Sequence, residues 1–140
     1  MRVYLSHAIR GAKGEACTRE QQKKNCDNAL AFAEEIRKAC PWIDLYVPAE
    51  HEEFVQIAYD KKYLTVDQIL EVDFEIIRGC QAVLVYAPNG EEIQGGRKAE
   101  LDFALGKEMW VHAAEDSADA VEWVTYVYDY ADSDDYFGEH

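Results

Sequence analysis

Positive charge is scarce in this chain of 140 residues, which has 14 Lys and Arg against 28 Asp and Glu and a net charge of −14. Binding along a nucleic-acid backbone depends on many Lys and Arg contacts to phosphates. We therefore expect no nucleic-acid polymer as a partner. A small anionic ligand is compatible with this charge where a local Arg or a helix N-terminus receives it.

Long apolar runs are also lacking. The sequence contains no stretch of about 20 apolar residues, the length that crosses a bilayer, and Met1 is followed by a charged residue and a short strand pattern. A secretory signal would place an apolar segment there. The sequence therefore predicts a soluble, cytoplasmic protein that does not bind a membrane.

Metal-ligand spacing is missing too. The cysteines contain no CxxC pair, and His7, His51 and His112 are not spaced as zinc ligands are. We expect no metal, no cofactor and no disulfide framework. Buried, reduced thiols are expected at Cys17, Cys26, Cys40 and Cys80.

The chain does have ample material for a core. Its hydrophobic content of 49% and aromatic content of 12% favour a globule over a disordered chain. The length fits one domain of ordinary size. We predict a single domain over residues 1–131, followed by a solvated acidic tail over residues 132–140.

Strand and helix patterns alternate along the chain. Apolar runs predict strands at residues 2–6, 42–47, 82–86 and 108–112. Pairs of Thr with Gln three residues later, at positions 18 and 65, predict capped helices to about residues 39 and 78. A shorter helix is expected before Lys107. Residues 50–63 are expected to be partly helical and to cover the site, and residues 117–130 fit a helix or a strand, with a helix favoured over the first half.

This alternation predicts an α/β fold, with a parallel sheet of four to five strands and helices on both faces. The run at residues 82–86 is the most apolar and is expected to be central. In such sheets, ligands bind outside the carboxyl ends of the strands. The loops after the first three strands are therefore where we expect a site.

Asp73 falls within the apolar stripe of the helix predicted before residue 79. An unpaired carboxylate in such a stripe is costly, so its pKa should rise or it should find a donor. A raised pKa suits a general acid. The alternative is a structural acid that bonds a backbone N–H or Arg78. The stripe consists of Val66, Ile69, Leu70 and Ile77.

Glu100 is expected in the first turn of the helix that follows Gly95 and Gly96. There, backbone N–H groups and the helix dipole would stabilise the anion, which suits a nucleophile or a base. The alternative is that the acid merely stabilises the helix. Two carboxyl groups whose environments pull their pKa values apart form the pair that glycosyl-transfer chemistry uses.

The loop after the first strand carries Arg10 and Gly11 beside Ser6 and His7. Arg10 offers a fork of donors that matches a phosphate or a carboxylate. Gly11 permits close approach of the backbone to a ligand. The alternative is a flexible basic loop with no binding role.

Three ordered motifs resemble the nucleoside 2-deoxyribosyltransferase superfamily. They are Tyr4-Leu-Ser-His-Ala-Ile-Arg-Gly11, then Asp73 with Ala82-Val-Leu-Val85, and then Gly95-Gly96 leading to Glu100 and to Ala104-Leu-Gly-Lys107. The similarity covers roughly residues 1–112. The first loop is most similar to the deoxynucleoside 5′-monophosphate N-glycosidase branch.

The resemblance implies a flavodoxin/Rossmann-like fold and an enzyme that cleaves or transfers at the N-glycosidic bond of a (deoxy)nucleoside or its 5′-monophosphate. It implies that Glu100 attacks C1′, that Asp73 assists departure of the base and that Tyr4 lies near the sugar. It also implies a homodimer or larger homo-oligomer, with residues 126–130 as an interface. The substrate-binding residues that it implies are Ser6, His7, Ile9, Arg10, Gly11, Asn89, Gln94 and Gly96.

The sequence also departs from the family, and alternatives stay open. Gln94 stands where the family usually has Ser or Asp, with Asn89 or Glu91 as the alternative for that role. A non-catalytic nucleotide-binding or sequestering protein on the same fold is the competing class. Gly95-Gly96 before Glu100 is also faintly similar to phosphoribohydrolases of the lysine-decarboxylase-like type, whose Thr and Pro are missing here.

Overall fold

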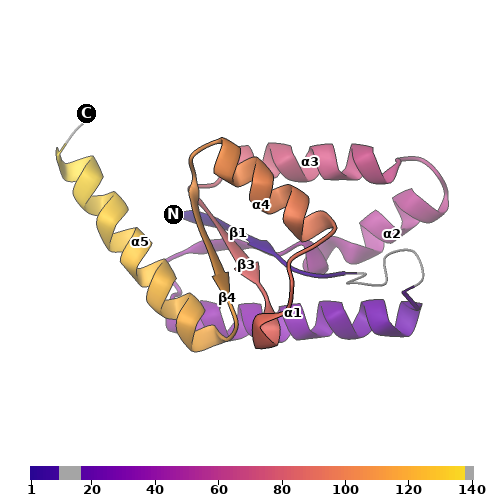
Figure 1. Ribbon diagram of the computed structural model, residues 1–140, viewed down its shortest axis with the longest axis horizontal. Coiled ribbons are helices and arrows are strands. Elements are labelled where there is room, and N and C mark those ends of the chain that lie inside the picture. Colours follow the sequence, from indigo (N-terminus) through magenta and orange to yellow (C-terminus); the bar gives the residue numbers. More distant parts are fainter. Residues whose placement is uncertain (10–16, 138–140) are drawn as a thin grey trace.

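A four-stranded parallel sheet forms the centre of the molecule (Figure 1). The computed structural model describes residues 1–9 and 17–137. Neighbouring strands are parallel throughout, in the order β2-β1-β3-β4. The predicted α/β class and the central place of β3 are confirmed. The strands are β1 (Arg2–Ser6), β2 (Asp44–Tyr46), β3 (Ala82–Tyr86) and β4 (Trp110–Ala114).

The predicted helix starts are also confirmed. The Thr18 side chain accepts from the backbone N–H of Gln21, and Thr65 with Gln68 forms a complete capping box. Within the described ranges, no helix is long and apolar enough to span a membrane. The helices are α1 (Arg19–Ala39), α2 (Glu52–Asp60), α3 (Val66–Arg78), α4 (Gly96–Gly106) and α5 (Ser117–Phe137), with 3-10 turns η2 (Pro48–His51) and η3 (Pro88–Gly90).

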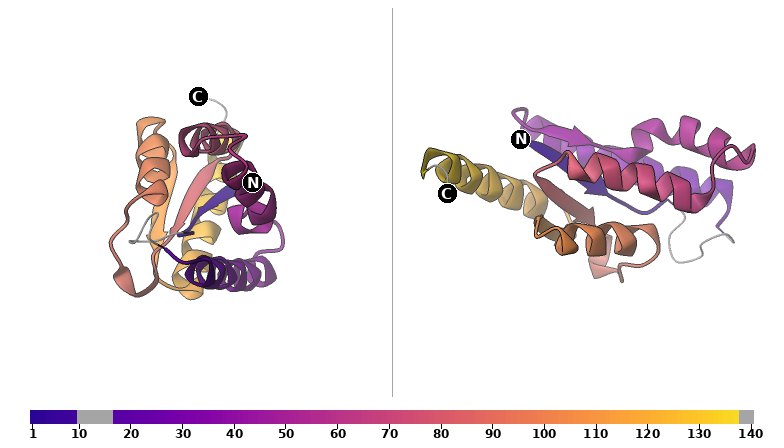
Figure 2. Two further views of the ribbon diagram at one scale, coloured as in Figure 1. Left: turned by 90° about the vertical axis from the view of Figure 1, so that its right-hand side faces the viewer. Right: turned by 90° about the horizontal axis from the view of Figure 1, so that it is seen from above.

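Helices cover both faces of the sheet (Figure 2). Successive side chains of a strand point to opposite faces, so Leu5 and Leu84 pack in the core that includes α1 and α5, whereas Tyr4 and Val83 pack with α3 and α4. α2 belongs to neither of the two cores and lies at the carboxyl ends of the strands. The four cysteines are buried and free, as expected.

Three element boundaries differ from the prediction. β4 begins at Trp110 rather than residue 108, because Glu108 takes a φ of 58° as the chain leaves α4. β2 is limited to Asp44–Tyr46. α5 is helical throughout and continues to Phe137, through residues expected to form a tail. Val124 and Val127 are fully buried at helical spacing, and this packing decides for a helix over a strand.

Candidate active site

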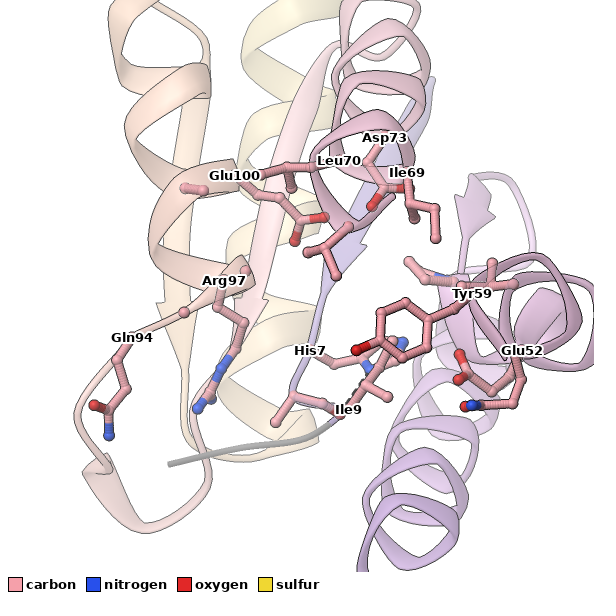
Figure 3. Close-up of a pocket in the computed structure, with 18 residues that line it drawn as sticks. His7, Ile9, Glu52, Tyr59, Ile69, Leu70, Asp73, Gln94, Arg97 and Glu100 are labelled. Atoms are coloured by element: carbon pink, nitrogen blue, oxygen red, sulfur yellow. Dashed lines mark hydrogen bonds between the residues drawn. The ribbon is translucent and has the colours of Figure 1, made fainter. Parts of the chain in front are cut away.

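A cavity of about 420 Å³ opens at the carboxyl ends of the strands (Figure 3). Its volume is in the range of small-molecule sites. The residues after β1 form its floor, and η2, α2, α3 and the start of α4 form its walls. The predicted position of a site, at the loops after the first three strands, is therefore where the cavity lies.

Glu100 is held by two hydroxyl groups from β1. Tyr4 donates to its Oε2 and Ser6 donates to its Oε1, each at 2.6 Å. Tyr4 and Ser6 are two residues apart on one strand, so both point to the face that α4 covers. Both are fully buried, whereas Glu100 lines the cavity. Tyr4 and Ser6 therefore act as the support of Glu100 from behind.

Asp73 lines the cavity from α3 and lies opposite Glu100 (Figure 3). Burial raises the pKa of Asp73 to about 6, although hydrogen bonding with Glu100 and Tyr4 acts in the opposite direction. The sequence predicted a raised pKa or a donor partner for Asp73, and burial gives the raised pKa. Arg78, the alternative partner, pairs with Glu75 instead. Asp73 is therefore an acid of the cavity wall.

The environment of Glu100 differs from the one expected. α4 begins at Gly96, so Glu100 lies in its second turn and receives its hydrogen bonds from side-chain hydroxyls. Burial raises its pKa to about 7; the hydroxyls of Ser6 and Tyr4 lower it, and the nearby charge of Asp73 raises it further. The expectation that the two carboxyl groups have opposite pKa shifts is wrong, because both are withdrawn from water.

Arg97 is a site residue that the sequence interpretation missed. It is 5% exposed and lines the cavity. Its Nη1 donates to the carbonyl of Tyr86 at 2.8 Å and to Glu91 at 2.6 Å. The spacing of Arg97, Glu100 and Ala104, all buried on α4, is the signal that places Arg97 on the inward face. Arg97 thereby fastens the loop after β3 to the start of α4.

His7 lines the cavity as a neutral side chain. Its Nε2 accepts from the backbone N–H of Ala49 at 3.0 Å, and its Nδ1 lies 3.1 Å from the carbonyl of Ala8. Nδ1 therefore carries the proton. Burial lowers the pKa of His7 to about 4. This neutral ring ties the end of β1 to η2, from which α2 follows.

The other predicted binding residues divide into three groups. Ile9, Gln94 and Gly96 line the cavity. Asn89 lies exposed in η3 with a φ of 59° and is not among the described residues that line it. Arg10 and Gly11 lie outside the described residues.

Asp73 and Glu100 are two buried or half-buried carboxyl groups that line the same cavity. No protein-family model, curated protein or solved structure matches the chain. Two carboxyl groups that gain and lose protons near neutral pH can supply one nucleophile and one acid.

α2 and α3 present the same residue spacing to the cavity, with members at positions i, i+3, i+4 and i+7. The expectation that residues 50–63 cover the site agrees with the place of α2. The α3 set includes Asp73, which explains why an acid interrupts an otherwise apolar stripe. The two sets are Glu52, Val55, Gln56 and Tyr59, and Val66, Ile69, Leu70 and Asp73.

Proposed function

We propose that the protein cleaves or transfers at the N-glycosidic bond of a nucleoside or its 5′-monophosphate, through a covalent glycosyl ester on Glu100. The observation that carries the proposal is the pair of Glu100 and Asp73 in one cavity, with Glu100 held by Tyr4 and Ser6. Glycosyl transfer with retention uses such a pair, one member as nucleophile and the other as acid and then base.

In the first step, a carboxylate oxygen of Glu100 attacks C1′ while the bond from C1′ to the base nitrogen breaks. The electron pair of that bond leaves with the base, and the carboxyl group of Asp73 donates its proton to the base. The hydroxyls of Tyr4 and Ser6 support this assignment, because each donates to Glu100 and lowers its pKa. They also fix the direction of its oxygens, which reduces the entropy lost on reaching the transition state.

In the second step, an acceptor attacks C1′ and the ester bond to Glu100 breaks, which restores the carboxylate. With water as the acceptor, Asp73 takes one of its protons and the product is the free sugar. With a second base as the acceptor, Asp73 takes the proton from its attacking nitrogen and the product is a new nucleoside. The same residues therefore serve hydrolysis and transfer, and the acceptor that enters decides between them.

The test is incubation with a panel of nucleosides and 5′-monophosphates, with chromatography of the released base. We expect release by the wild type and none by Glu100→Gln, which keeps the shape of the side chain but cannot form the ester. Acid-quenched wild-type protein should also gain the mass of one glycosyl group. Binding of the panel without base release would favour the alternative, a nucleotide-binding or sequestering protein.

A further inference from the structure

α2 is an amphipathic helix whose inward stripe faces the cavity rather than a protein core. Its buried residue is Ala58, whereas Val55, Gln56 and Tyr59 are half-buried and line the cavity. A ligand that covers apolar surface in a cavity removes it from water, which favours binding. The α2 wall is therefore suited to an apolar or aromatic part of the ligand.

Tyr59 extends from α2 into the cavity (Figure 3). The backbone beside it is fixed, since Ala58 is buried and its carbonyl accepts from the N–H of Tyr63 at 2.9 Å. Asp60 pairs with Arg19 of α1 at 2.6 Å. The burial of Ala58 and its bond to Tyr63 fix the backbone at Tyr59 before a ligand arrives, which lowers the entropy cost of binding. The exposed pair of Arg19 and Asp60 adds little.

The apolar wall of α3 lies directly beside the acid of the carboxyl pair. Ile69 and Leu70 line the cavity one helical turn before Asp73, a rise of about 5 Å along the helix axis. A flat ring that covers Ile69 and Leu70 thus lies next to the Asp73 carboxyl group. A base leaving from C1′ must be in that position to receive its proton, with the sugar toward Glu100.

We infer that Tyr59 is the side chain on which the base of the substrate stacks, and that this wall makes the site favour purines over pyrimidines. The inference rests on the proposed function, which identifies the ring as a nucleobase. Stacking on an aromatic side chain accepts any base, because every base has a π-face. Its strength grows with the ring area covered, and a purine has two fused rings where a pyrimidine has one.

The test measures binding in the turnover-blocked Glu100→Gln protein, with deoxyadenosine and deoxycytidine as probes in calorimetry. Tyr59→Ala should lower the affinity for deoxyadenosine by about 5- to 150-fold, the usual range for loss of one base stack. It should lower the affinity for deoxycytidine by less. Tyr59→Phe should keep the purine preference. Tyr63→Ala is the matched control, because Tyr63 is 72% exposed and is not among the described residues that line the cavity.

Tyr59→Leu covers the case in which the alanine variant does not fold, since it keeps apolar volume but removes the π-face. It should lose the purine preference. An unchanged ratio of the two affinities in both Tyr59→Ala and Tyr59→Leu would overturn the inference, as would loss of the purine preference in Tyr59→Phe.

The inference and the proposed function fail separately. Tyr59-dependent preference for deoxyadenosine, with no base release by the wild type, supports the inference and contradicts the proposed function. Base release with a ratio that does not depend on Tyr59 supports the proposed function and overturns the inference. Absence of both binding and base release across the panel would overturn both.

Discussion

The phenolic hydroxyl of Tyr4 donates a hydrogen bond of 2.6 Å to Oε2 of Glu100, a residue 96 positions later in the chain. Tyr4 lies opposite Val83 in the parallel pairing of β1 with β3, on the face that α4 covers. Burial raises the pKa of Tyr4 well above its ordinary value, and the charge of Glu100 raises it further. The phenol therefore stays protonated and remains a donor throughout the physiological pH range.

Tyr4→Phe should move the acid limb of the pH–rate profile to higher pH. The variant removes a donor that lowers the pKa of Glu100, and hydrogen bonds to charged groups contribute about 1.5–3 kcal/mol. We expect kcat/KM for base release at neutral pH to fall by roughly 10- to 150-fold. Tyr46→Phe is the control. The ring of Tyr46 stacks on that of Tyr4 with 5.5 Å between the centroids, and the variant removes a hydroxyl from this pair while the Tyr4 hydroxyl stays in place. An acid limb that does not move would show that Tyr4 has only a packing role.

Asp73→Asn should lower the rate of base release by about 10²- to 10⁴-fold, the range typical of general acid catalysis. The amide keeps the shape of the side chain but has no proton to give. Nucleosides with a good leaving base should lose less, since they need less help from an acid. Asp67→Asn is the control, because Asp67 is an exposed acid of the same helix, and it should leave the rate of base release unchanged. Equal losses across leaving groups, with a large drop in melting temperature, would instead favour a structural acid.

The pH dependence of kcat/KM for base release should be bell-shaped, with its maximum between about 6 and 7. The proposed mechanism needs Glu100 ionised and Asp73 protonated, so the pair must hold one proton. Burial raises the pKa of Asp73 to about 6 and that of Glu100 to about 7, and the active form is the one in which the shared proton lies on Asp73. Below this window both carboxyl groups are protonated, and above it both are ionised. A profile that rises to a plateau above pH 8 would contradict the need for a carboxylic acid.

Glu100→Gln should change how stability depends on pH. A carboxyl group with a raised pKa in the folded state contributes stability that is present below its unfolded pKa and is lost as pH rises through its folded pKa. For Glu100 the loss occurs between about pH 4.5 and pH 7. A tenfold change in proton affinity is about 1.4 kcal/mol. The free energy of unfolding of the variant, relative to that of the wild type, should therefore rise by at least ~1 kcal/mol from pH 5 to pH 8. Urea unfolding of both proteins at pH 5 and pH 8 measures this difference. The same difference in free energy of unfolding at both pH values would contradict the prediction.

Arg97→Ala should lower the free energy of unfolding by about 1–3 kcal/mol, because it leaves the Tyr86 carbonyl and Glu91 without their donor. It should also loosen the loop that carries Gln94 and so raise KM. Lys98→Ala is the matched control: the Lys98 side chain is 57% exposed and pairs with Asp102 on the helix surface, where such a pair contributes little. Equal stability of the two variants would show that the buried contacts of Arg97 do not hold the loop.

Much of the fold could be predicted because it depends on neighbours within a few residues. Thr65 and Gln68 are three positions apart, and their mutual hydrogen bonds start α3 as expected. The apolar run of β3 and the helical spacing of α3 are equally local. Asp73 was identified as unusual by the same reasoning, since an acid within an apolar stripe is visible in the sequence alone.

By itself, the sequence determined most of the order of strands and helices along the chain, and hence a parallel sheet whose strands end at one edge. The tertiary structure decided the chemistry of the site at that edge. The pKa of Glu100 depends on its burial, and on Tyr4 and Ser6, which donate to it from 96 and 94 positions away. Desolvation and hydrogen bonding are set by the groups that lie close in space, and the residues near Glu100 in the chain do not identify Tyr4 and Ser6 as its partners.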